Sequence, residues 1–85
     1  MKLVFEKAAR KGLAKMSPKA ASAMLERLVT VAAAPHRRHP NVKPLVGHQD
    51  AYRLRQGDWR GIYVLDYSTD EMRVVLVDVR GSVYR

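Results

Sequence analysis

Apolar residues recur at three- and four-residue steps in the first half of the chain and alternate with polar residues in much of the second half. Residues 2–5 form a short β-branched and aromatic run, which predicts a strand. Residues 6–16 have helical spacing. A second helix should begin at Ser17, a favoured N-cap, followed by Pro18 at the first helical position, and should end at Pro35. Its expected apolar face consists of Ala21, Met24, Leu25, Leu28, Val29 and Ala32.

The second half of the chain predicts β-structure. Residues 36–48 contain two prolines, a glycine and several cations, which indicates a loop. Residues 51–55 and 59–67 alternate around a glycine-containing turn at residues 56–58, a hairpin signal. The turn at residues 68–71 leads to a valine-rich strand at residues 72–79, and a last short strand is expected at Val83 and Tyr84.

This order of elements predicts an α+β fold in two layers. The two helices should form an antiparallel hairpin, because only a very short turn joins them. The hairpin should pack on one face of a mainly antiparallel, four- to five-stranded sheet, with a β-meander supplying most of the strands. The chain has 85 residues, so residues 1–85 are expected to form a single domain. One face of the sheet would then remain uncovered.

The strongest chemical signal is a group of arginines on the predicted hairpin. Side chains alternate between the faces of a strand, so Tyr52 and Leu54 can be buried while Arg53 and Arg55 lie together on the other face. Arg60 arrives on that face from the next strand. Charged residues are also common on the solvent face of an antiparallel sheet, which is the simple structural interpretation.

Local charge favours a binding role for these arginines. No acidic residue falls on their face within residues 51–57. The preceding loop adds Arg37, Arg38 and Lys43, so residues 35–60 hold six lysines and arginines against two acids, a balance of +4. The whole chain has a net charge of +8. This excess attracts anionic partners such as nucleic acids or acidic proteins, and phosphate is the obvious ligand for clustered guanidiniums.

Other features narrow the chemistry and the setting. The chain has no cysteine, which excludes disulfides and thiolate zinc sites and favours a reducing compartment. The sequence shows no signal peptide and no transmembrane-length apolar run, so we expect a cytoplasmic protein without a membrane role. His36, His39 and His48 match no strong zinc pattern and are interpreted as solvated loop residues. No metal or cofactor is therefore expected.

The motifs taken together resemble the RelE/ParE superfamily of bacterial toxins from type II toxin–antitoxin systems. The resemblance covers nearly the whole chain. It rests on the helical hairpin, on residues 41–47 (Asn-Val-Lys-Pro-Leu-Val-Gly), on the arginine hairpin at residues 52–63 and on residues 79–85 (Val-Arg-Gly-Ser-Val-Tyr-Arg). Any one of these pieces is weak, and their combination is specific.

The resemblance implies a ribosome-dependent mRNA endoribonuclease that inhibits translation. RelE-like members cleave through attack of a ribose 2′-OH on the adjacent phosphorus, without a metal. By resemblance, Arg55 and Arg60 would stabilise transition-state charge, Arg80 would assist the leaving oxygen and Tyr84 would orient the substrate. Arg53 would bind RNA, and the basic loop suggests the same role for Arg37, Arg38 and Lys43. The implied partners are mRNA, the ribosome and an acidic antitoxin in a hetero-oligomer.

Two departures from the family pattern leave alternatives open. Several family nucleases have a histidine where this chain has Val79, and some relatives have lysine where this chain has Arg53, so no residue is an evident general base. ParE-like members share the fold but inhibit DNA gyrase without cutting RNA. A third alternative is a non-toxic, basic nucleic-acid-binding module.

Overall fold

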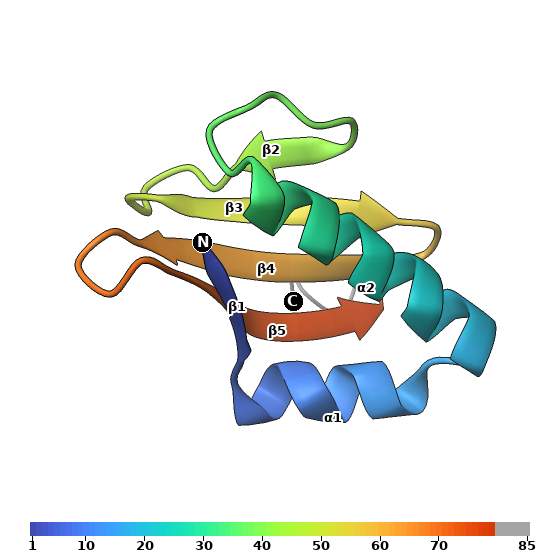
Figure 1. Cartoon of the computed structure of the whole chain (residues 1–85). Helices are drawn as coiled ribbons and strands as arrows, with labels where there is room; N and C mark the ends of the chain where they lie inside the picture. Colours follow the sequence, from blue (N-terminus) through green and yellow to red (C-terminus); the bar gives the residue numbers. More distant parts are fainter. Residues whose placement is uncertain (80–85) are drawn as a thin grey trace.

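The computed structural model describes residues 1–79 (Figure 1). Within these residues, two helices and five strands follow one another in the predicted order of strand, two helices and sheet. They are β1 (Lys2–Phe5), α1 (Lys7–Lys15), α2 (Pro18–Ala33), β2 (Val42–Pro44), β3 (Ala51–Gln56), β4 (Trp59–Asp66) and β5 (Glu71–Val79). The expected final strand at Val83 and Tyr84 lies outside the described residues. The predicted α+β, two-layer architecture is confirmed.

The five strands form one sheet in the order β1-β5-β4-β3-β2. β1 runs parallel to β5, and the other neighbours are antiparallel. β2 is a strand within residues 36–48, which the sequence predicts to be loop throughout. Pro40 and Pro44 led to the loop prediction, because proline is rare in strands. Pro44 is tolerated here because β2 is a short edge strand, where the missing N–H need not interrupt the hydrogen bonds between strands.

Both helices pack on the same face of the sheet. Gly12 of α1 lies so close to β5 that an added Cβ would be 1.8 Å from the carbonyl oxygen of Val77. In β4, Gly61 faces Met24 and Leu28 of α2. Gly61 and Val77 are register partners, so these two contacts mark one face. In Figure 1, α1 runs along β5 and α2 returns across the sheet toward β2.

The helix start at Ser17 is confirmed, but part of the predicted α2 face is wrong. The Ser17 hydroxyl accepts a hydrogen bond from the Ala20 N–H at 3.2 Å. Leu25 and Val29 are 37% and 57% exposed. The buried stripe is Met24, Leu28, Val31 and Ala32. The buried stripe of α2 is thus narrower than the predicted apolar face, and one apolar edge of α2 remains in contact with solvent.

The opposite face of the sheet carries the arginine hairpin and is not covered by the described helices. Leu54 in β3 and Tyr63 in β4 are buried on the helix side. Because side chains alternate along a strand, the residues directly before and after each of them point to the open side. A register irregularity between Ile62 and Tyr63 shifts the pairing of β4 with β5. Within residues 1–79, neither helix is both long and apolar enough to cross a bilayer.

Candidate functional site

Strand register brings four cations together on the open face. Arg53 pairs with Lys43 on one side, and Arg55 pairs with Arg60 on the other. Residues directly opposite on antiparallel strands have Cβ atoms roughly 4.5–5.5 Å apart, so these side chains are neighbours across three strands. The predicted grouping of Arg53, Arg55 and Arg60 is confirmed in the structure, and Lys43 joins it from β2.

These four side chains and Asn41 line a cavity of about 90 Å³, which we call the cationic cavity. A space of this size can hold a small anion such as phosphate. Arg60 is only 8% exposed, whereas Arg55 is exposed at the rim. Asn41 has a φ of 59°, and its carbonyl oxygen accepts a hydrogen bond from the Arg55 N–H at 2.9 Å. This backbone hydrogen bond holds Asn41 and Arg55 in fixed positions relative to each other at the cavity.

The electrostatics of the cationic cavity favour an anionic ligand. Like charges directly opposite on a sheet destabilise it, and withdrawing a guanidinium from water is costly. Asp78 of β5 is the register partner of Arg60 and lies on the same open face. Its carboxylate accepts the Val79 N–H at 2.7 Å. Among residues 1–79, the four cations that line the cavity outnumber the single carboxylate of Asp78 beside them.

Sequence reasoning missed Asp78 as a neighbour of this group. The parity of alternation in β5 identifies its face only if the pairing of β4 and β5 is known. The irregularity at Ile62 and Tyr63 changes that parity midway along the pair. Since nothing in the sequence marks the irregularity, the position of Asp78 could not be read from the pattern.

Arg73 shows a different arrangement at the other end of the open face. Its guanidinium contacts the carboxylates of Glu71 at 3.2 Å, Asp66 at 3.4 Å and Glu6 at 3.7 Å. The Ser68 hydroxyl donates to Asp66 at 2.6 Å and lowers the pKa of that carboxyl. Arg73 is therefore neutralised by its neighbours, while the cationic cavity lies in the half of the sheet formed by β2, β3 and β4.

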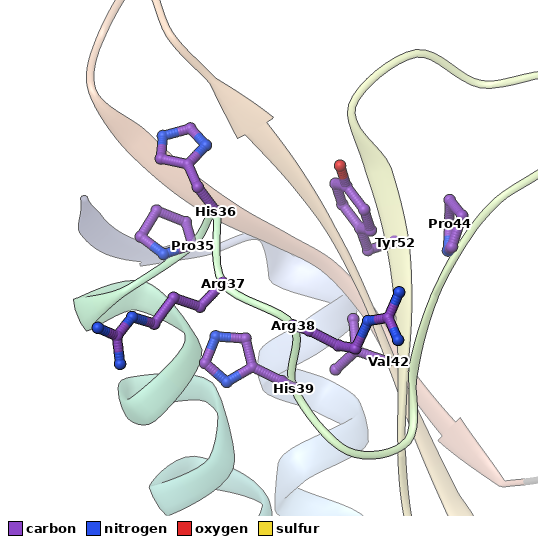
Figure 2. Close-up of a pocket in the computed structure, with 8 residues that line it drawn as sticks. All are labelled: Pro35, His36, Arg37, Arg38, His39, Val42, Pro44 and Tyr52. Carbon is purple, nitrogen blue, oxygen red and sulfur yellow. The ribbon is translucent and has the colours of Figure 1, made fainter.

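Arg37 and Arg38 lie apart from the cationic cavity. With His36, His39 and Tyr52 they line a separate hollow of about 320 Å³, which also contacts Pro35, Val42 and Pro44 (Figure 2). Tyr52 stacks on Tyr63 with centroids 5.5 Å apart, and Tyr63 belongs to the buried core. This hollow, the loop hollow, therefore opens on the helix side of the β2–β3 edge. The six predicted site residues that fall within residues 1–79 therefore do not form one cluster.

Two of the histidines in the loop hollow have defined neighbours. The Nε2 atom of His39 lies 2.8 Å from the carbonyl oxygen of Ala34, the residue just after α2. The ring of His36 stacks on Tyr67 with centroids 5.6 Å apart. In residues 1–79 no three histidines, cysteines or acids gather in a way that could hold a metal ion. The predicted site residues Arg80 and Tyr84 lie outside the described residues.

Comparison with known proteins gives a consistent structural relationship. No protein-family model and no curated protein sequence matches the chain. Among solved structures, the isolated RelE toxin of E. coli matches with a TM-score of 0.80 and 25% identity, over 98% of this chain and 89% of that chain. The archaeal RelE–RelB complex from Pyrococcus horikoshii matches with a TM-score of 0.79 and 25% identity, over 94% of each chain.

A third similar structure is a RelBE toxin–antitoxin complex from Mycobacterium tuberculosis. It has a TM-score of 0.74 and 26% identity, over 93% of this chain and 96% of that chain. Each match covers most of this chain and most of the matched chain, as the resemblance in motifs predicts. They identify the chain as a toxin of the RelE/ParE superfamily, the toxin class of type II toxin–antitoxin systems.

Proposed function

We propose that this toxin is an endoribonuclease that cleaves mRNA on the ribosome and so inhibits translation. The observation that carries the proposal is the cationic cavity, where Lys43, Arg53, Arg55 and Arg60 converge on a space of phosphate size. A fixed set of cations is what phosphoryl chemistry needs, because negative charge accumulates on the phosphorus oxygens in the transition state.

The proposed reaction is an internal transfer of the phosphoryl group. The ribose 2′-oxygen forms a bond to phosphorus, and the bond from phosphorus to the 5′-oxygen breaks. The 2′-hydroxyl loses its proton, and the leaving 5′-oxygen gains one. The products are a 2′,3′-cyclic phosphate and a 5′-hydroxyl. Arg55 and Arg60 would hold the nonbridging oxygens, since a guanidinium fork can donate to two oxygens at once.

The other predicted residues take supporting roles in this proposal. Lys43 and Arg53 border the cationic cavity and would bind the phosphates of the RNA strand. From the family resemblance, Arg80 would assist the leaving oxygen and Tyr84 would orient the substrate. Neither a metal nor a cofactor is required by this chemistry. The charged arginines act mainly through positioning and electrostatic stabilisation rather than as a base.

Arg37 and Arg38 would contact RNA away from the cleavage point. They line the loop hollow on the helix side of the sheet edge. A strand bound in the cationic cavity could meet them only by passing around β2, so we assign them to ribosomal or more distant RNA. Binding there would add affinity without stabilising the transition state.

We also propose an acidic antitoxin as the physiological partner. Two of the similar structures are toxin–antitoxin complexes. The chain carries a net charge of +8, which favours an acidic chain electrostatically. Such a partner would typically contribute a segment that folds on binding. Co-expression with the acidic neighbouring reading frame should relieve toxicity, and failure of every neighbouring frame to do so would contradict this assignment.

The activity can be tested with purified toxin, ribosomes and a defined transcript. Primer extension should show new 5′ ends within codons when the transcript is translated, and the fragments should carry 5′-hydroxyl and cyclic phosphate ends. The gyrase alternative is tested in parallel with a DNA supercoiling assay. Intact transcripts together with failed supercoiling would replace the ribonuclease proposal with the ParE-like one.

A further inference from the structure

A second hollow adjoins the cationic cavity on the open face. It has a volume of about 520 Å³ and is lined by Lys43, Pro44, Leu45, Val46, His48, Arg53 and Ile62. Lys43 and Arg53 line the cationic cavity as well, so the two spaces share a cationic wall. Beyond that wall the lining is mainly aliphatic. We call this second space the apolar groove.

The loop that forms one side of the apolar groove has a defined backbone. The Leu45 N–H donates to the carbonyl oxygen of Ala51 at 2.9 Å, which continues the pairing of β2 and β3. The His48 N–H donates to the carbonyl oxygen of Leu45 at 3.3 Å and closes a tight turn. Gly47 has a φ of 82°, the left-handed conformation that glycine adopts without strain. The loop therefore presents Val46 and His48 at set positions.

Val46 is the feature of this loop that its fold does not explain. Its side chain is 98% exposed, so it adds nothing to the core. The other aliphatic side of the groove comes from Ile62, which stands on the open face of β4 as the register partner of Arg53. An aliphatic side chain beside a pair of cations can contact a ligand that combines an apolar face with a neighbouring negative charge.

We propose that the apolar groove binds the nucleobase attached to the RNA phosphate held by Lys43 and Arg53. This inference rests on the proposed ribonuclease function and specifies its substrate contact. A nucleotide places a flat ring with apolar faces beside its phosphate, which matches an aliphatic groove that shares a cationic wall with a phosphate-sized cavity. The imidazole of His48 lies at the lining, where it can hydrogen-bond the polar edge of a base. The groove would then set nucleotide preference next to the cleaved bond.

The test measures affinity rather than cleavage. A short 2′-O-methyl oligoribonucleotide, which has no attacking hydroxyl, is compared with the same oligonucleotide lacking one base, by fluorescence anisotropy on the full chain. The wild-type toxin should bind the complete oligonucleotide about tenfold more tightly, the effect expected from burying one face of a base. Val46→Ser and Ile62→Thr should each lose most of this preference. Arg55→Ala should weaken binding of both oligonucleotides equally.

Val29→Ser is the matched control, because Val29 is an exposed valine on α2, which packs on the opposite face of the sheet, and it does not line the groove. It should keep the full preference. The inference is overturned if the wild type does not distinguish the two oligonucleotides, or if Val46→Ser and Ile62→Thr behave like Val29→Ser. It is also overturned if these variants instead weaken only the binding of antitoxin. Retained base preference without cleavage on ribosomes would reject the ribonuclease proposal alone.

Discussion

Two buried or half-buried arginines on one sheet face illustrate how environment decides the role of a residue. Arg73 contacts three carboxylates, whereas Arg60 is 8% exposed and lies among three other cations and Asp78. The first arrangement satisfies a charge within the fold. The second concentrates positive charge around a cavity of phosphate size, which is why we propose phosphate binding for Arg60 and a structural role for Arg73.

The ion pairs of Arg73 should contribute little stability. The side chain is about one-third exposed, and salt bridges in contact with water are worth at most about 1 kcal/mol. Arg73→Ala should therefore lower the free energy of unfolding by no more than about 1 kcal/mol in urea denaturation. It should leave RNA affinity unchanged to within a factor of two. A marked loss of RNA binding would show that Arg73 belongs to the interface.

Tyr63 predicts a loss of stability at alkaline pH. Burial raises the pKa of its phenol to about 12, above the value near 10 of an unfolded chain. The contribution of this phenol to the free energy of unfolding is fully present below pH 10. It is lost as pH rises toward 12, because in that range the unfolded state releases the phenol proton while the folded state keeps it. The loss is at most about 1.4 kcal/mol per pH unit. Tyr63→Phe should flatten this part of the curve of unfolding free energy against pH.

Tyr67→Phe is the control for the Tyr63 measurement. Tyr67 is 52% exposed, so its ionisation should affect folding less. It should keep most of the alkaline loss seen in the wild type. If Tyr63→Phe and Tyr67→Phe have the same pH dependence, the phenol of Tyr63 is not the group responsible.

At the scale of the elements, the contact between α1 and β5 is unusually close. Gly12 is buried, and a Cβ at this position would meet the backbone oxygen of Val77, which cannot rotate away. This contact requires glycine although glycine is a poor helix former. It fixes the distance of α1 from the sheet, and thereby the support of the strand that carries Asp78.

Gly12→Ala tests that contact. In an open helix this change would stabilise by about 1 kcal/mol, but here the overlap should reverse the sign. We expect a decrease of about 2 kcal/mol or more in the free energy of unfolding, measured by urea denaturation. Lys11→Ala, at the exposed neighbouring position, should change it by less than about 0.5 kcal/mol. A stabilised Gly12→Ala protein would show that α1 lies farther from β5.

Elements with a strong local pattern were predictable from the sequence. The cap at Ser17, the hairpin turn at Gly57 and the alternation from Tyr52 to Arg55 are local signals, and each gave the correct element. The short strand β2 and the irregularity at Ile62 were not predictable, because they depend on pairing between distant segments. The same limit explains the site: Arg53, Arg55 and Arg60 were grouped correctly, whereas Lys43 and Asp78 needed the register.

At the scale of the whole molecule, positive charge is divided between two places. The net charge is +8, and four cations line the cationic cavity while Arg37 and Arg38 line the loop hollow on the helix side. A short RNA strand can occupy only the first. A ribosome, which surrounds a small protein with phosphates, can meet both, so the two groups should separate in binding experiments.

Salt dependence distinguishes these two groups. Four phosphate contacts to a single strand predict a log–log slope of about −2.8, or roughly 50-fold weaker binding of a short oligonucleotide between 50 and 200 mM salt. Arg55→Ala should reduce the slope to about −2.1, since one contact is lost. Arg38→Ala should leave the slope unchanged for the short oligonucleotide and weaken binding to ribosomes. An affinity independent of salt would contradict phosphate binding altogether.

The most direct test of the account is the cleavage rate on programmed ribosomes for wild type, Arg60→Ala, Arg55→Ala and Arg73→Ala. Thermal unfolding first verifies that each variant is folded, and the exposed Arg55 supports the result if the buried Arg60 perturbs the fold. We predict that Arg60→Ala and Arg55→Ala each slow cleavage by about 10²- to 10³-fold, as for removal of a donor that stabilises transition-state charge. Arg73→Ala should cleave at the wild-type rate. Folded Arg60→Ala and Arg55→Ala proteins that cleave as fast as Arg73→Ala would contradict the assignment of the cationic cavity as the catalytic site.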